Sequence, residues 1–383
     1  MERGETYGYP SRMSKVLSRI AGETGIARVD SILADDLSPS DLQSLLLHAF
    51  QARAAKLRES DLVKAASRPL LGPSKIDARV LNRFEQVAFA AAVGFDAIEL
   101  SPVCPLGLSR VLGEIDQNNV LTTIRNAEVL GDPTPALALE CVRRRRDPEQ
   151  RGAGVVRLCA SQRVIRLQPF DFPGYTPHFR LFALVSAGRD TGSEAFELEQ
   201  LGEHIRFYLE LCRGLNKSGF SLESPLVEIA DAGVIRGLLE QAGVAAEDLR
   251  AAVRAHKPGE SERFLEARGV RLPENVDDPA SELGLDPRHR LSRLHAEVFG
   301  PLRASYPEAQ FRINLARLEG LGYYRGLCLR ISPVAPDGNR YPVIDGGFTD
   351  WTARMLQDRK ERLLTSGIGS EFACTRYRNG QQR

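Results

Sequence analysis

Methionine and tryptophan are scarce in this chain: three methionines and one tryptophan occur among 383 residues. Apolar runs long enough to cross a bilayer are also missing, so the sequence predicts no transmembrane helix. The first residues, MERGETYGYPSRMSK, lack the apolar segment of a secretory signal peptide. We therefore expect a cytoplasmic protein that does not bind membranes.

An excess of either sign of charge is missing too. Lys and Arg number 51 and Asp and Glu 50, which gives a net charge of +1. Such a balance creates no global field that would attract nucleic acid. The run Arg143–Arg146 is best explained as the last turn of a helix, where cations suit the helix dipole.

Closely spaced cysteines are absent as well. The chain has six, and no pair has the CxxC spacing of zinc knuckles and redox motifs. Five of them have apolar neighbours, which indicates buried thiols in a reducing compartment. We predict no metal site from them. The six positions are Cys104, Cys141, Cys159, Cys212, Cys328 and Cys374.

What is present is the composition of a globular protein, with 43% hydrophobic and 26% charged residues. Periodicity predicts helices at 38–60, 74–95, 133–146, 196–215 and 350–364. Strand patterns occur at 96–105, 155–170, 178–190, 311–318, 323–334 and 341–347. Hairpins join the strands more often than crossovers do. We therefore predict an α+β fold, an antiparallel sheet of six or seven strands flanked by helices.

The same pattern suggests four segments. A helical extension covers residues 1–70, and the first part of the α+β domain covers 71–224. A charge-rich helical insertion is expected at 225–305, before the last part of the domain at 306–383. No internal repeat interrupts this order.

Six short segments, in this order, carry a resemblance to a known family. They are VGFDAIELSPV, VLGDPTPALALECVRR, the pair RVIRLQPF and HFRLFALVSAGRD, INLARLEGLGYYRG, IDGGFTDW and SGIGSE. Together they resemble the catalytic core of class II aminoacyl-tRNA synthetases, nearest to the histidyl type. They are also similar to the regulatory subunit of ATP phosphoribosyltransferase, a paralogue of that type. The resemblance covers about residues 75–375 and implies a homodimer formed through the first segment.

The resemblance implies an amino-acid pocket. Asp132 and Thr134 take the places of the family's Arg-Pro-Glu-Gly-Thr segment, whose carboxylate holds the substrate amino group, and Glu128 lies just before them. Since neighbouring residues of a strand point in opposite directions, only one of two adjacent tyrosines is expected to enter the pocket. The further substrate-binding positions implied are Arg180, Glu319, Tyr323, Tyr324, Asp345, Gly346 and Gly347.

The resemblance also implies a site for ATP and Mg²⁺. Arg166 takes the place of the arginine that grips the α-phosphate, and Glu371 would help to place ATP or the metal. His178 and Phe182 are implied as further cofactor contacts. A plainer explanation exists for Arg166 and Arg180 as solvated strand charges and for His178 as a packing residue.

Two departures weaken the case for ATP, and a third weakens the case for tRNA. Glu319 stands where the family has an arginine that stabilises charge at the reacting carboxylate. Phe372 follows Glu371 where the family has the arginine that clamps the γ-phosphate. Phosphoryl-transfer chemistry depends on such positive groups. The last residues, CTRYRNGQQR, leave no room for an anticodon-binding domain, so tRNA is not an expected partner.

The segment Ile115–Thr134 is rich in both strand-forming and hydrogen-bonding residues. A strand that lines a pocket shows one face to ligand and one to core, so every second side chain is free to be polar. We predict that this segment forms the floor of the amino-acid pocket. The alternative is an exposed strand and loop.

These observations leave three functions open. The first, which the density of polar residues favours, is a ligase that activates an amino acid with ATP for an acceptor other than tRNA. The second is a non-catalytic regulatory subunit that binds an amino acid and reports its presence to a partner enzyme. The third is a relic that retains only the dimer.

Overall fold

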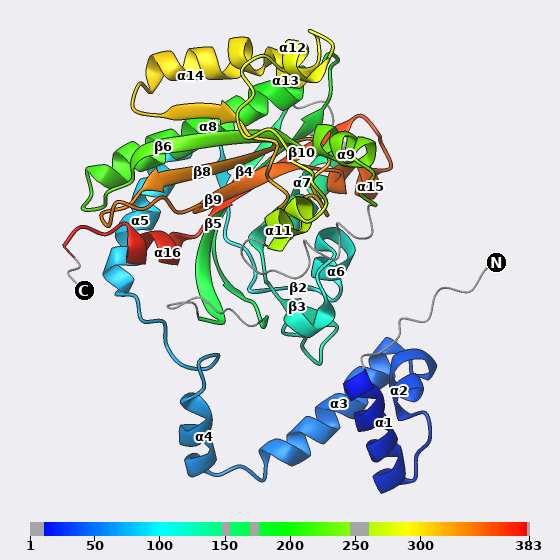
Figure 1. Cartoon of the computed structure of the whole chain (residues 1–383). Coiled ribbons are helices and arrows are strands. Elements are labelled where there is room, and N and C mark those ends of the chain that lie inside the picture. The colour runs from blue at the N-terminus through cyan, green and yellow to red at the C-terminus, as the bar shows by residue number, and fades with distance from the viewer. Residues whose placement is uncertain (1–10, 148–153, 169–175, 246–259, 381–383) are drawn as a thin grey trace. The chain divides into compact units, whose positions relative to one another are not determined.

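The computed structural model describes residues 11–147, 154–168, 176–245 and 260–380 (Figure 1). Two compact units are formed. One comprises residues 1–71 and 122–127, and the other comprises residues 72–121 and 128–383. The expected helical insertion and the two parts of the α+β domain fall within the second unit, except residues 71 and 122–127.

The first unit is helical. The helix predicted at 38–60 starts as expected but ends at Ala54. The Ser38 hydroxyl accepts a hydrogen bond from the Asp41 N–H at 3.1 Å, and Pro39 occupies the first turn. No residue of α2, η1, α3 or α4 is buried. Its elements are α1 (Ser11–Thr24), α2 (Val29–Ser31), η1 (Ile32–Asp36), α3 (Pro39–Ala54) and α4 (Glu59–Ala66).

An eight-stranded sheet is the centre of the second unit. Its strands, in spatial order, are β1 (Asp96–Ala97), β4 (Val156–Ile165), β5 (His178–Arg189), β10 (Glu361–Ile368), β9 (Ile344–Thr349), β8 (Leu327–Val334), β6 (Glu223–Asp231) and β7 (Gln310–Ile313). The β1–β4 and β6–β7 pairs are parallel, and the other pairs are antiparallel. The predicted α+β class is confirmed, with one strand more than expected.

Helices cover both faces of the sheet. On β10, Leu364 and Ile368 join the core formed with α5 (Ala78–Ala91), α8 (Ala195–Asn216) and α16 (Ser370–Arg376). Leu363, which points the other way, joins the core formed with α6 (Leu108–Gly113), α7 (Pro133–Arg146) and α15 (Trp351–Leu356). We call these sides the α8 face and the α7 face.

The helical insertion begins later than predicted. Residues 225–231, expected to be helical, belong to β6, because Val227 and Ile229 are fully buried and pair with both β7 and β8. The elements between β6 and β7 are α9 (Ala232–Gln241), α11 (Glu260–Glu266), α12 (Pro279–Leu283), α13 (Arg290–Leu294), η3 (His295–Phe299) and α14 (Gly300–Ser305).

The helix expected at 350–364 is also shorter than predicted. It ends as α15 at Leu356, and Gln357 adopts a left-handed conformation with φ 54°. The chain then turns, and Glu361 opens strand β10, which pairs with β5 and β9. Sheet pairing therefore overrides the helical pattern of these residues.

The segment Ile115–Thr134, predicted to form a strand on the floor of the amino-acid pocket, does not join the main sheet. The segment forms η2 (Gln117–Asn119) and a three-residue strand, β3 (Ala127–Val129), which pairs only with β2 (Val103–Pro105). Its polar groups are used locally. Asp116 caps η2 by accepting a hydrogen bond from the Asn118 N–H at 3.0 Å.

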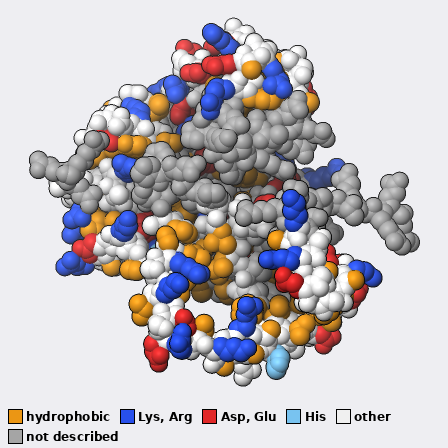
Figure 2. Space-filling view, turned by 60° about the horizontal axis from the view of Figure 1, so that its bottom comes forward, with side chains coloured by type: hydrophobic (Ala, Val, Ile, Leu, Met, Phe, Trp, Pro, Cys, Tyr) orange, Lys and Arg blue, Asp and Glu red, His pale blue; other side chains and the backbone are white. Residues whose placement is uncertain are grey.

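The surface of the described residues carries many apolar side chains, and hydrophobic groups are exposed between charged ones (Figure 2). Within the second unit they concentrate between the end of α5 and α6: Phe89, Val93, Val103, Leu106, Val111 and Ile115. All six cysteines are buried and free of disulfides, whereas the sequence predicts burial for five of them. In the described part of the chain, no helix combines the length and apolar character needed to cross a membrane.

Candidate functional site

One row of side chains on the α7 face crosses most of the sheet. The register of six strand pairs places these residues side by side, since paired residues point to the same face. Small side chains form one half of the row, which α7 covers, and alternating charges form the other. The row is Ala160, Ala183, Gly367, Asp345, Arg330, Glu228 and Arg312.

Ion pairs join this charged half to the loop that follows β7. Arg312 donates to Glu228 at 2.5 Å, and Asn314 donates to the same carboxylate oxygen at 2.7 Å. Arg330 donates to Glu319 at 2.7 Å. The Nε–H of Arg330 is buried and has no partner among the residues that the structure describes. Glu319, where the resemblance implies a substrate contact, therefore holds an arginine of the sheet.

Arg317 is the most deeply placed cation of the site. Only 3% of its side chain is exposed, and it forms an ion pair with Asp345 and donates to the Leu329 carbonyl at 2.7 Å. Burial opposes its charge, but the Asp345 carboxylate raises the pKa of Arg317 above its ordinary value. The Asp345 side chain is 45% exposed. A ligand would therefore meet Asp345 first, with Arg317 behind it.

Sequence reasoning missed Arg317. Counting back from the two tyrosines puts Glu319 at the place of the family's arginine, but the structure supplies a cation two residues earlier. The available signal was a charged residue in the otherwise apolar run of Leu315 and Leu318, both of which are buried. An unsupported charge in such a run indicates a buried partner.

Two glycines make room for the Tyr324 ring. A Cβ atom on Gly347 would lie 2.6 Å from the ring, and one on Gly320, whose φ is +82°, would lie 2.5 Å from it. The Tyr324 hydroxyl donates to Asp345 at 2.7 Å. On the opposite face, a Cβ atom on Gly346 would lie 2.5 Å from the Cβ of Ser366. The space beside both predicted glycine contacts is therefore filled by the protein itself.

Tyr323 packs against Tyr324. Its ring centroid lies 4.3 Å from that of Tyr324. Burial raises the pKa of Tyr323, and the charges of Asp345 and Asp132 raise it further. Asp132 and Asp345 thus act on the same phenol, although they come from α7 and β9.

Asp132, Thr134 and Arg166 form a second group on the α7 face. Asp132 caps α7 by accepting hydrogen bonds from the N–H and the hydroxyl of Thr134, each at 2.8 Å. Arg166 donates to its other oxygen at 3.1 Å and to the Gly131 carbonyl at 2.7 Å. The guanidinium lies 5.3 Å from the centroid of the Phe179 ring. The Asp132 side chain remains 43% exposed, so it is open to a ligand.

Glu128 has a supporting position. Its side chain is fully buried, and it accepts hydrogen bonds from the N–H groups of Gly107 and Ser109, both at 2.8 Å, and from Gln117 at 3.2 Å. Burial acts to raise the pKa of Glu128, but these donors hold it below the ordinary value. The carboxylate therefore fixes the start of α6.

Three predicted polar residues lie on the α8 face. Glu371 accepts a hydrogen bond from Ser74 and pairs with Arg163 at 3.2 Å. The Arg163 guanidinium contacts His178 at 3.0 Å, and Arg180 pairs with Glu85 at 3.4 Å. The structure therefore does not bring Glu371, His178 and Arg180 together with Arg166.

The Phe182 ring, predicted to contact a cofactor, is a core side chain. It is fully buried and stacks on Phe207 at 5.6 Å between ring centroids, with Phe89 at 5.1 Å. These neighbours leave no face of the ring for a cofactor. The aromatic ring beside Arg166 is instead that of Phe179. Phe179 and Phe182 are three residues apart in β5, so their side chains point to opposite faces of the sheet.

Comparison with known proteins agrees with this arrangement of strands and helices. No family model and no curated protein matches the sequence. Solved structures do match. An ATP phosphoribosyltransferase regulatory subunit/histidyl-tRNA synthetase from Bacillus halodurans superposes with a TM-score of 0.56 at 16% identity, over 83% of this chain and 84% of that one. The chain has the fold of a class II synthetase core.

Two further structures share this class II fold. A histidine–tRNA ligase subunit from Alicyclobacillus acidocaldarius gives a TM-score of 0.57 at 16% identity, over 80% of this chain and 95% of that one. The ATP phosphoribosyl transferase (HisG:HisZ) complex from Thermotoga maritima gives 0.51 at 15% identity, over 77% and 98%. At such identities the likeness establishes the class II fold and leaves the activity open.

Proposed function

We propose that this class II-like chain is a non-catalytic amino-acid-binding protein that regulates a partner enzyme. The observation that carries the proposal is the Arg317–Asp345 pair, in which a half-exposed carboxylate is backed by a buried guanidinium. Asp132, paired with Arg166, offers a second exposed carboxylate on the same face of the sheet. An amino acid presents an ammonium group and a carboxylate, and the site offers an acceptor and donors for them.

Charge balance supports a zwitterion over a polyanion. Four ion pairs lie at the proposed site, and in these pairs carboxylates and guanidinium groups are equal in number. A site for ATP needs an excess of positive charge to meet the phosphates. The pairs are Asp132–Arg166, Glu228–Arg312, Asp345–Arg317 and Glu319–Arg330.

The residues implied for Mg²⁺ and ATP fit these ligands poorly. Glu371 is engaged by Ser74 and Arg163 on the α8 face, and the Phe372 ring packs on Tyr341 at 5.7 Å between centroids. Among the described residues, no group of three or more His, Cys, Asp or Glu side chains is arranged to hold a metal. The proposal therefore includes no phosphoryl or adenylyl transfer.

A second candidate is the ATP-dependent activation of an amino acid for an acceptor other than tRNA. One observation favours it: Arg166 extends from the end of β4 beside the exposed Asp132 and the Phe179 ring. In that case Arg166 would release Asp132 and bind the α-phosphate. The Asp132 carboxylate, without its arginine partner, would then be free to bind the ammonium group.

A regulatory subunit also needs surfaces for assembly with other chains. We propose that the apolar side chains between Phe89 and Ile115 form a homodimer contact, since so many large exposed hydrophobic groups mark an interaction site. The complex from Thermotoga maritima, in which HisZ is assembled with HisG, suggests a partner enzyme of that kind.

The test is a calorimetric titration of the purified chain with each amino acid, with and without ATP and Mg²⁺. We expect one amino acid or a few related ones to bind, with an affinity that ATP does not change. Binding that requires ATP would favour the second candidate. A lack of binding by all amino acids would contradict both.

A further inference from the structure

A pocket of about 610 Å³ lies at one end of the sheet, where the end of β9 and the start of β10 meet α8, α13 and α15. This volume is in the range that small ligands occupy. None of the residues named for the amino-acid site lines it. The arginines of its lining are Arg290, Arg325, Arg354, Arg359 and Arg362.

One face of α15 forms a wall of the pocket. The lining residues Asp350, Ala353, Arg354 and Gln357 recur at positions i, i+3, i+4 and i+7, which form one stripe of a helix. Trp351, on the other side of this helix, is buried. The side chains of Asp350 and Arg354 therefore face the pocket and not the core.

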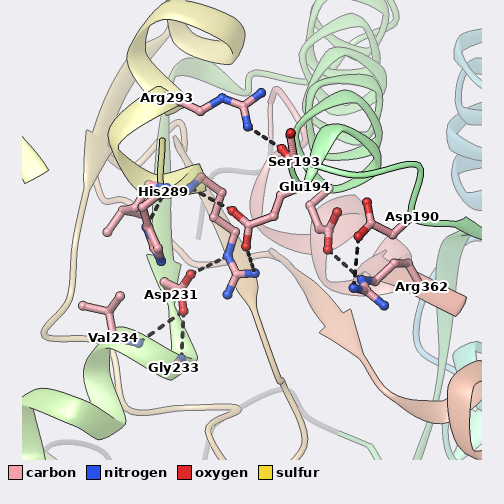
Figure 3. Close-up of polar contacts among 12 residues, drawn as sticks. Asp190, Ser193, Glu194, Asp231, Gly233, Val234, His289, Arg293 and Arg362 are labelled. Carbon is pink, nitrogen blue, oxygen red and sulfur yellow. Dashed lines mark hydrogen bonds and ion pairs between the residues drawn. The ribbon is translucent and has the colours of Figure 1, made fainter. Parts of the chain in front are cut away.

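Three of the carboxylates in the lining are held by arginines at hydrogen-bond distance. Arg290 and Arg362 each also contact a second carboxylate that does not line the pocket, and Figure 3 shows Arg362 turned toward Asp190. These two guanidinium groups are therefore occupied by the protein itself. The pairs are Glu194–Arg290 at 2.8 Å, Glu197–Arg362 at 2.7 Å and Glu361–Arg145 at 2.7 Å.

The α15 side of the pocket carries more positive than negative charge. Arg325 and Arg354 both approach the carboxylate of Asp350, at 3.4 and 3.6 Å, and their side chains are 42% and 47% exposed. Arg359 is exposed and forms no ion pair with another described residue. Among the described residues of this side, three guanidinium groups thus meet a single carboxylate, which gives an excess of two positive charges.

These arginines keep N–H groups for a ligand. A guanidinium has five donors. Arg354 uses one of them on the Val111 carbonyl at 3.1 Å, and Arg325 uses one on the Gly322 carbonyl at 3.3 Å. Their distances to Asp350 are longer than the distances in the pairs on the α8 side. The protein therefore satisfies these two arginines less fully than it satisfies those of the α8 side.

Phosphate is the chemical group that suits this arrangement. A phosphate monoester carries a charge of about −1.5 to −2 at pH 7 and presents three acceptor oxygens. Arginine donates to phosphate through two parallel N–H groups, and clusters of arginines recognise phosphate groups in several kinds of binding domain. A dianion would offset the excess of positive charge without displacing the pairs of the α8 side.

We propose that the α15 side of this pocket binds the phosphate group of a small molecule. Arg325, Arg354 and Arg359 would donate hydrogen bonds to its oxygens, and Asp350 would hold Arg325 and Arg354 in place when the ligand leaves. The same chemistry fits inorganic phosphate and a phosphorylated small molecule, which titration distinguishes. The inference does not depend on amino-acid binding, because the two sites share no residue.

Isothermal titration of the full chain at constant ionic strength tests the proposal, with inorganic phosphate, glycerol 3-phosphate and succinate as probes. We expect both phosphates to bind about ten times more tightly than succinate, which carries its two charges on separate carboxylates. A higher affinity for glycerol 3-phosphate identifies a phosphorylated small molecule as the ligand, and an equal or higher affinity for inorganic phosphate identifies the free ion. Succinate that binds as tightly as both phosphates, or no binding of either phosphate, would overturn the proposal.

Arg359→Gln removes one of the three guanidinium groups without breaking an ion pair between described residues. We expect the midpoint of urea unfolding to stay the same, while phosphate binds about ten times more weakly. Arg271→Gln is the matched control: Arg271 is also exposed, forms no ion pair with another described residue and does not line the pocket. Equal losses in both variants, or no loss in Arg359→Gln, would overturn the proposal.

Asp350→Asn should have the opposite effect. It keeps an oxygen for the arginines and removes the negative charge. The Asp350 side chain makes no capping hydrogen bond to α15, so the start of this helix should not change. Because the carboxylate competes with phosphate for Arg325 and Arg354, phosphate should bind several times more tightly to the variant. An unchanged or lower affinity would contradict the excess of positive charge as the cause of binding.

Discussion

The two faces of the sheet use buried polar groups in different ways. On the α7 face, Arg317 is buried behind Asp345, which remains half exposed. On the α8 face, His204 lies between Ser186 at 2.9 Å and Ser366 at 2.8 Å, and Tyr208 donates to Ser366 at 2.8 Å. The first arrangement ends at solvent and is able to meet a ligand. The second is closed and holds α8 on the sheet.

The largest effect is expected at the open face. Asp345→Ala leaves the Arg317 guanidinium buried without a counter-charge, which should lower the free energy of unfolding by about 3 kcal/mol. Amino-acid binding should disappear. Urea unfolding and calorimetry measure the two effects.

The double variant Asp345→Ala with Arg317→Met supplies the control. Because it removes the isolated charge, it should recover most of the stability lost in the single variant, but not the binding. A double variant as unstable as the sum of the single ones would contradict a direct coupling of the two residues.

Ser366→Ala should test the closed face. It removes the partner of both Tyr208 and His204, whose side chains are buried, and should cost about 2 kcal/mol of unfolding free energy. Amino-acid affinity should stay within twofold of the wild-type value by calorimetry. A tenfold loss would mean that the two faces are coupled through the sheet.

The closed face should also make stability depend on pH. Burial, and to a smaller extent Arg157, lowers the pKa of His204 to about 3. In the unfolded chain the histidine binds a proton near pH 6.5. The contribution of neutral His204 to the free energy of unfolding is therefore complete above that pH and is lost as the pH falls toward 3. Because of this group, the free energy of unfolding should change by up to about 1.4 kcal/mol per pH unit.

Urea unfolding between pH 7 and pH 5 measures this slope, and His204→Gln should reduce it. The amino-acid affinity of this variant at pH 7 should remain unchanged. An identical pH dependence in wild type and variant would show that His204 is not the group responsible.

Asp132→Ala should give the smallest change in stability. The loss of the α7 cap costs about 1 kcal/mol. The variant also removes the exposed carboxylate beside Arg166 and Tyr323, so amino-acid affinity should fall about tenfold. Thr134→Ala, which removes a hydroxyl from the same turn but no charge, is the control for effects on the helix alone. Equal affinities in Asp132→Ala and wild type would place the ammonium group elsewhere.

The sequence was sufficient for the sheet and for the main helices because their patterns are long and regular. Helix α7 begins at Pro133 and ends at Arg146, as the periodicity and the arginine run predict. Ile115–Thr134 was misread because groups such as Asp116 bond to nearby backbone, and such local capping resembles a polar strand in composition.

The site was harder to predict because it depends on which face each side chain takes. Arg163 and Arg166 are three residues apart and therefore point to opposite faces, as do Phe179 and Phe182. The position of Arg317 depends on the turn at Gly320, whose positive φ changes the distance between the arginine and the tyrosines. The first feature follows from the spacing only when both residues belong to one strand, and the second depends on a backbone conformation.

The most direct test of the central claim is ATP–pyrophosphate exchange by the wild-type protein, with Mg²⁺ and the amino acid that binds in calorimetry. The proposed regulatory function predicts amino-acid binding without exchange above the level of a protein-free control. Exchange that depends on both the amino acid and Arg166 would contradict it and identify the chain as an amino-acid-activating enzyme.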